Sequence, residues 1–194
     1  DIGPFDFKGL SFNGPVQLGS TSLYGIPLVN LRGSYEFRNN RLSLTSLSGT
    51  IAERGSFTLG ASVDFGVQGL EYAARLEFGD LPMQALSRLI GFDLSSFVTG
   101  SLSGTCRVAG RGTTPAGFFE NLTGEADLVL DNGRVKGLGV PDQLLSFLKS
   151  EALRELVFSD ARIHCTLSNG AIRLADGAIL SRNIQILPSG TVGI

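Results

Sequence analysis

The sequence predicts a mainly β fold: a long curved antiparallel meander that forms a groove or a partly closed sandwich or barrel. Three observations support this prediction. Apolar and polar residues alternate along much of the 194-residue chain, as they do in strands with one buried face. Asparagine turns separate the alternating runs, as expected for hairpins. The composition, with 26 Gly, 13 Phe and no Trp, suits turn-rich strands with apolar faces.

The alternating runs define the predicted strands. The clearest is SFTLGASVDF at residues 56–65, in which Phe57, Leu59 and Val63 share one face while serines, a threonine and Asp64 share the other. Comparable runs occupy residues 31–37, 70–78, 102–108, 124–130, 161–167 and 171–174.

Hairpin turns are predicted where asparagine can adopt a positive φ. The three segments are RNNR (38–41), LDNGR (130–134) and LSNGA (167–171). Consecutive strands should therefore be antiparallel neighbours. The Gly-rich segment 109–124, which also contains Pro115, is predicted to be a loop.

Two segments change to a helical period and predict short amphipathic helices at about 81–90 and 141–156. The first has Asp80 as a candidate cap, Pro82 in its first turn and Gly91 as its stop. The second begins near Pro141 and carries a leucine stripe.

Residues 1–194 are predicted to form one domain with an internal half-repeat, which relates residues 29–66 to residues 157–194. At a shift of 130 residues, turn residues and apolar positions coincide, as for Leu174 and Leu44. Because the sequence begins DIGPFDFKGL without a Met and ends in the strand-like PSGTVGI, we interpret it as a piece of a longer protein.

Composition and motifs exclude several functions. With 18% charged residues and a net charge of −2, the chain has no basic footprint for nucleic acid. Cys106 and Cys165 lie on apolar sides of their runs, which favours small buried hydrophobic residues over a disulfide or a reactive thiol. The single histidine, His164, lies on a polar face and is expected to be solvated. No catalytic residue, metal site or cofactor is predicted, so we expect a protein that is not an enzyme.

The apolar face of the strands is the main candidate for function. The predicted strands present more apolar surface than two short helices can cover. Either a second layer of the same sheet closes over this face, or the sheet stays open and its apolar concavity holds a ligand such as acyl chains.

Several segments resemble the AsmA family of bacterial envelope proteins. Residues 99–148, with GRGTT at 110–114 and DNGRVKG at 131–137, resemble the C-terminal region of this family. Residues 24–65 look like the preceding module, and FSDARIHCTLSNGAIRL with LPSGTVGI look like the closing strands. The family is similar to TamB and to chorein-type bridges, which are elongated β-sheet troughs with an apolar interior.

The resemblance implies a periplasmic protein that is anchored to the bacterial inner membrane through a segment outside this sequence. It implies phospholipid or another acyl-chain lipid as partner, with envelope proteins as further candidate partners, and a role in lipid transport between membranes and in outer-membrane biogenesis. The lipid-facing positions are predicted from the alternation: Phe57, Leu59, Val63, Leu70, Leu76, Leu102, Val108, Leu128 and Leu130.

Alternative functions remain open at this point. The sequence is also compatible with a non-catalytic structural or assembly scaffold, or with a ligand-binding β-sandwich that has a closed core. A carbohydrate binder is disfavoured because Trp is absent and Tyr occurs only three times. A hydrolase would require His164 to lie beside an acid and a hydroxyl group in a cleft.

Overall fold

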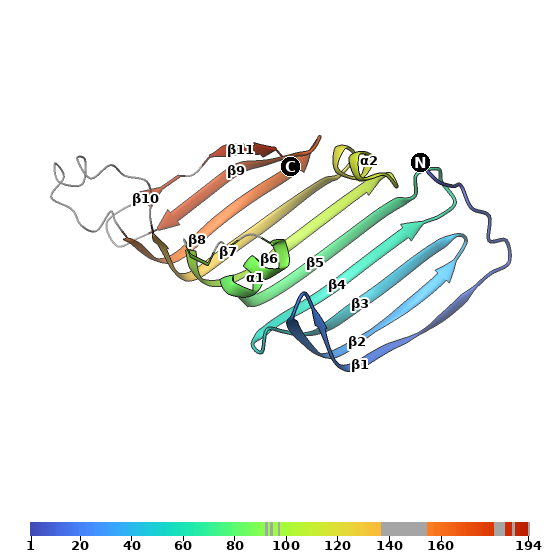
Figure 1. Cartoon of the computed structure of the whole chain (residues 1–194), viewed down its shortest axis with the longest axis horizontal. Helices are drawn as coiled ribbons and strands as arrows, with labels where there is room; N and C mark the ends of the chain where they lie inside the picture. The colour runs from blue at the N-terminus through green and yellow to red at the C-terminus, as the bar shows by residue number, and fades with distance from the viewer. Residues whose placement is uncertain are drawn as a thin grey trace.

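The computed structural model describes residues 1–91, 93, 95–96, 98–136, 155–180, 185–187 and 189–193. Within these residues, eleven strands form one sheet in the order β1 to β10, each antiparallel to the next, and β11 also pairs with β9 (Figure 1). The sheet is not closed into a barrel. The predicted mainly β antiparallel meander is therefore confirmed, and its open form excludes the closed barrel.

The strands are long and follow one another along the chain. Their bounds are β1 Phe12–Leu23, β2 Ile26–Arg38, β3 Arg41–Ile51, β4 Gly55–Asp64, β5 Glu71–Pro82, β6 Val98–Arg111, β7 Thr123–Lys136, β8 Glu155–Ser168, β9 Ala171–Leu180, β10 Gln185–Ile186 and β11 Gly190–Gly193. The β1 strand was not predicted, since its sequence FNGPVQLGSTSL alternates weakly and contains Pro15.

Asparagines form two of the three predicted turns. Asn39 and Asn40 have φ values of 51° and 62° between β2 and β3, and Asn169 has a φ of 50° between β8 and β9. The predicted hairpin at 130–134 is wrong, because β7 runs through it. Asn132 keeps a positive φ of 50°, and the pairing of β6 with β7 shifts register there, so the residue forms a bulge instead of a turn.

The first predicted helix is confirmed as α1, Met83–Ile90, but its N-cap is Pro82 and not Asp80. Gly91 ends α1 with a φ of 69° and donates its N–H to the carbonyl of Ser87.

The loop prediction for residues 109–124 is wrong in part, and the second predicted helix falls mostly outside the described residues. A second helix, α2, occupies Pro115–Glu120 inside the segment predicted to be a loop. Thr114 caps α2 by accepting a hydrogen bond from the Gly117 N–H at 3.1 Å, and Pro115 stands in the first turn. Of the helix predicted at 141–156, residues 141–154 lie outside the described residues and the last two belong to β8.

The core lies where α1 packs on one face of the sheet, in front of β5 and β6 in Figure 1. One buried cluster joins α1 to the later strands and consists of Met83, Leu102, Leu130, Phe158 and Ala161. A second joins α1 to the early strands and consists of Ile26, Ile51, Leu81 and Ala85. Phe78 and Leu86 pack against both clusters, so α1 links strands that are far apart in the sheet.

The N-terminal segment, residues 1–11, is tied to strand ends distant from α1. The Ile2 N–H donates to Thr113 Oγ1 at 3.0 Å, and the Phe5 N–H donates to the Phe65 carbonyl at 2.7 Å. The Phe7 N–H donates to Asn40 Oδ1 at 2.7 Å, and the Phe7 ring lies edge-on to Phe65. These contacts join the turns of the first half of the sheet.

The single-domain assignment and the half-repeat stay predictions. Both repeat segments contain an Asn hairpin followed by a third strand. In the first, Leu44 pairs with Ala61 of β4, and in the second Leu174 pairs with Gly190 of β11.

Candidate functional site

The candidate site is the part of the apolar sheet face that α1 does not cover. Strand registers align its side chains in rows across the sheet; one row runs from Leu59 through Leu76, Cys106 and Ala126 to Cys165. We call this surface the open apolar face. Its members are Leu42, Leu44, Leu47, Leu59, Ala61, Val63, Tyr72, Ala74, Leu76, Cys106, Val108, Ala126, Ile163, Cys165, Leu167, Ile172 and Leu174.

Side chains of the open apolar face are half-buried, except for Ile172, which is exposed at 37%. Those under α1 are buried, as for Ala161, which is 2% exposed. The described helices and strands therefore leave a broad apolar surface that is only partly shielded from solvent. Such a surface is typical of an interaction site.

The nine predicted lipid-facing residues occupy four different environments. Leu59, Val63, Leu76 and Val108 lie on the open apolar face, and Phe57 and Leu128 lie at its border with the clusters under α1.

The remaining three predicted residues occupy other environments. Leu102 and Leu130 are each 7% exposed and pack in the buried cluster with Met83, so in this fold they are core residues. Leu70 lies in the turn before β5 with a φ of 50°. Contact of any of the nine residues with lipid stays a prediction.

The two cysteines are free and half-buried on the open apolar face. Cys106 and Cys165 both pair with Ala126, from opposite sides of β7. Two strand spacings separate them by roughly 10 Å, whereas a disulfide needs Cα atoms within about 7 Å. Burial raises the pKa of both thiols, which disfavours the reactive thiolate. The interpretation as small apolar residues is thus supported.

The open apolar face is partly covered by α2 at the end distant from α1. The Phe118 ring stacks on Tyr72 with centroids 4.9 Å apart, and the Tyr72 hydroxyl donates to the Phe118 carbonyl at 3.3 Å. This partial burial raises the pKa of the Tyr72 hydroxyl.

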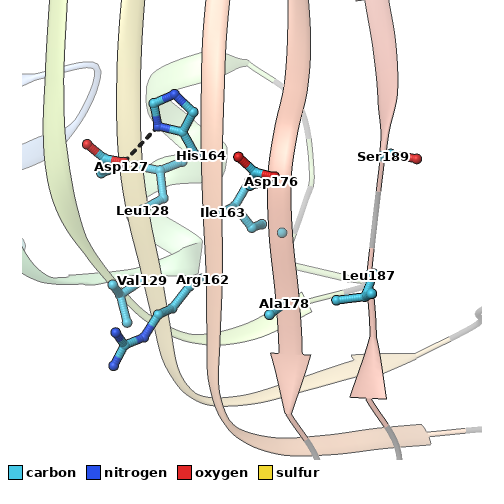
Figure 2. Close-up of a pocket in the computed structure, with 11 residues that line it drawn as sticks. Asp127, Leu128, Val129, Arg162, Ile163, His164, Asp176, Ala178, Leu187 and Ser189 are labelled. Carbon is cyan, nitrogen blue, oxygen red and sulfur yellow. Dashed lines mark hydrogen bonds and ion pairs between the residues drawn. The ribbon is translucent and has the colours of Figure 1, made fainter.

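On the opposite, polar face, His164 pairs with an acid that the sequence reasoning missed. His164 Nδ1 lies 2.7 Å from Asp127 Oδ1, and both line a pocket of about 640 Å³ with Asp176 and Ser189 (Figure 2). Asp127 and His164 are cross-strand partners of β7 and β8, so only the strand register could have shown the pair.

The geometry of this pocket does not assemble a hydrolytic triad. Figure 2 shows the Ser189 side chain directed away from His164, on the far side of Asp176. In the described part of the chain, no hydrogen bond joins Ser189 to His164. The His164 side chain is 33% exposed, in agreement with the expected polar-face position.

Replacing His164 with glutamine is expected to change the pH dependence of stability. The hydrogen bond to Asp127 raises the pKa of His164 above its ordinary 6.5, partial desolvation lowers it, and the charges of Asp127, Glu125 and Asp176 raise it further. Because the folded state holds this proton more tightly, the stabilisation is present below the unfolded pKa of 6.5 and is lost as the pH rises through the higher folded pKa.

Urea titrations of the wild type and of His164→Gln, at a pH below and a pH above this pKa range, check the prediction. The midpoint difference between wild type and His164→Gln should be larger below about pH 6 than above about pH 8. Asp127→Asn serves as the partner control and should lose the same pH dependence. If the difference in urea midpoint between wild type and His164→Gln is the same at both pH values, the prediction is wrong.

No group of three or more His, Cys, Asp or Glu side chains is arranged to hold a metal ion within the described ranges. Among the same residues, no helix has the length and apolar character needed to span a membrane.

Comparison with known proteins gives one match. A model of the AsmA family matches residues 12–176, from the start of β1 into β9. No curated protein and no solved structure matches the chain.

Proposed function

The chain belongs to the AsmA family, whose members are bacterial envelope proteins, and on this basis we propose that it binds phospholipid or another acyl-chain lipid on the open apolar face. The proposed setting is the periplasm, in a protein anchored to the inner membrane. The proposed role is to help move lipid between the two membranes during outer-membrane biogenesis.

The observation that carries this proposal is the half-buried state of the open apolar face. Each methylene group that leaves water for such a surface gains about 0.8 kcal/mol before ordering costs. An acyl chain is therefore a chemically matched occupant, because it presents only apolar surface. The sheet stays open, so a lipid head group can remain in water while the chain is covered.

The proposed mechanism is passive and non-catalytic. Rows of apolar side chains cross the sheet without interruption by a charged residue from Leu59 to Cys165. A lipid could move from one strand to the next along such rows while meeting similar surface at every step. This proposal requires no nucleotide or metal.

A pair of adjacent alanines in β5 gives a matched test. Ala74 is half-buried on the open apolar face, between Ala61 and Val108, whereas Ala73 is exposed on the polar face. Ala74→Asp should reduce co-purified phospholipid more than tenfold, because a carboxylate there must be desolvated by the bound chain. Ala73→Asp introduces the same charge one residue away and should leave lipid binding unchanged.

The measurement is native mass spectrometry of each protein after purification from a bacterial envelope, with circular dichroism to show that both variants keep the fold. Equal amounts of lipid on the two variants would exclude this face as the binding site. Wild-type protein without any bound lipid would favour a structural or scaffold role instead.

A further inference from the structure

The N-terminal segment carries exposed apolar side chains along one margin of the sheet. Figure 1 shows this segment outside the strand ends, on its way from the N-terminus to β1. Phe5, Phe7 and Leu10 are 39%, 38% and 48% exposed, and Phe12 at the start of β1 is 44% exposed. We call these four residues the apolar corner. It lies at the strand ends distant from α1, because α1 covers the other end of β2 at Ile26.

Aromatic contacts hold the apolar corner in place. The Phe5 and Phe7 rings stack with centroids 6.0 Å apart, and the Phe12 ring stacks on Phe37 at 5.1 Å. The Phe7 ring lies edge-on to Phe37 at 5.6 Å, and Phe37 itself is buried. The Leu10 N–H donates to the Phe7 carbonyl at 3.0 Å. The exposed side chains therefore rest on a buried ring, and an exposed apolar patch of this kind is typical of a contact site.

The apolar corner is continuous with the open apolar face. Phe12 pairs with Phe37, Phe37 pairs with Leu42, and Leu42 pairs with Val63. This row contains only apolar residues, and its last two members belong to the open apolar face. A molecule that touches the corner therefore meets no charged side chain between it and the proposed lipid-binding surface.

Basic side chains border the apolar corner. Lys8 and Arg38 line a pocket of about 440 Å³ together with Phe7 and Leu10. The acid in the lining of this pocket is Asp6, whose carboxylate lies 2.7 Å from the Lys8 ammonium. Arg38 is exposed, and it forms no ion pair with any residue that the structure describes. The pocket therefore keeps one positive charge that no acid neutralises.

Exposed apolar side chains beside an unpaired cation suit the surface of a phospholipid bilayer. In a protein segment that rests on a bilayer, apolar side chains enter the boundary of the acyl region while basic side chains meet the phosphate groups. A soluble partner would need a surface shaped to fit these side chains, whereas a fluid bilayer adapts to them. A bilayer is also the source of the lipid proposed for the adjoining face.

We infer that the apolar corner inserts into the surface of a phospholipid bilayer, with Lys8 and Arg38 at the level of the lipid phosphates. The contact brings one margin of the open apolar face to a supply of lipid. Its role in lipid exchange rests on the proposed function, whereas the membrane contact itself is tested independently.

Co-sedimentation with vesicles tests the contact on the full chain. The vesicles contain phosphatidylethanolamine and phosphatidylglycerol in equal parts. Phe5→Asp should weaken binding to them roughly tenfold or more, because the carboxylate must be desolvated on insertion. Tyr24→Asp is the matched control, since Tyr24 is 75% exposed in the turn between β1 and β2, at the opposite end of the strands. This variant should bind like the wild type, and circular dichroism shows whether both variants keep the fold.

A charge reversal keeps the inference testable if Phe5→Asp disturbs the fold. Arg38→Glu leaves the aromatic contacts intact and should lower binding to the mixed vesicles severalfold, with little effect on vesicles of phosphatidylcholine alone. Arg75→Glu reverses an exposed charge on the polar face of β5 and should change neither. Equal binding of the two variants to the mixed vesicles would contradict the inferred contact.

The remaining outcomes separate failure of the inference from failure of the proposed function. Equal vesicle binding by Phe5→Asp and Tyr24→Asp, or no vesicle binding by the wild type, would overturn the inference. A wild-type dimer in analytical ultracentrifugation that Phe5→Asp dissociates would also overturn it, because the corner would then join two copies of the chain. The proposed function survives these results if native mass spectra show lipid on the wild type that Ala74→Asp loses. Absence of that lipid as well would overturn both.

Discussion

Replacement of Phe158 by alanine is expected to destabilise the fold by about 3–5 kcal/mol. Phe158 is 3% exposed in the cluster with Met83, Leu102 and Leu130, and its ring lies over Gly133, its cross-strand partner. Truncation removes these contacts and leaves a cavity, because the strands on both sides are fixed by their hydrogen bonds. The free energy of unfolding from urea titration measures the loss.

The adjacent Val157 provides the control for this prediction. It is 54% exposed, so Val157→Ala should cost well under about 1 kcal/mol. Comparable losses in the two variants would show that the cluster under α1 is not the stabilising core of the protein.

Replacement of Gly104 by alanine should cost about 3 kcal/mol through steric overlap. Gly104 lies on the apolar face of β6, opposite Leu128. A Cβ atom there would overlap the carbonyl oxygen of Asp127 and would lie 3.0 Å from Leu128 Cδ2. The oxygen belongs to the neighbouring strand, so relief requires the two strands to move apart.

The control is a glycine with free space in the same sheet. No atom lies within 4 Å of a Cβ built on Gly19 in β1, where φ is not positive. Gly19→Ala should therefore be neutral or stabilise the protein by up to about 1 kcal/mol, since alanine restricts the unfolded chain. The prediction is contradicted if thermal or urea unfolding places both variants within about 0.5 kcal/mol of the wild type.

Alternation in the sequence was sufficient to predict the sheet and the face that would be apolar, because period two is a local property of each strand. Local sequence motifs predicted structure less well where the same residues suit two different structures. The Asn-Gly at 132–133 has the chemistry of a hairpin turn but forms a bulge. Pro115 and its flanking glycines suggested a loop, although Thr114 before Pro115 is a helix-start signal and α2 begins there.

The sequence predicted which side chains lie on the apolar face of the sheet. It did not predict which of them α1 covers and which stay open. Leu102 and Leu76 follow the same alternation, yet Leu102 lies under α1 and Leu76 does not. Which of them is covered depends on where α1 packs, and that position follows from contacts with strands more than 50 residues away, such as Phe158. The pair of His164 and Asp127 was missed for a related reason, since it depends on the register of β7 and β8.

The consecutive strand order has a consequence for cooperativity. Pairing between sequence neighbours alone would give a nearly one-dimensional array, in which each hairpin gains or loses structure with little influence on distant ones. Helix α1 changes this, because its two buried clusters tie Ile26 of β2 and Phe158 of β8 to the same short element. The strands between them are thereby coupled into one unit of folding, while pairings outside that span keep the independence of an array.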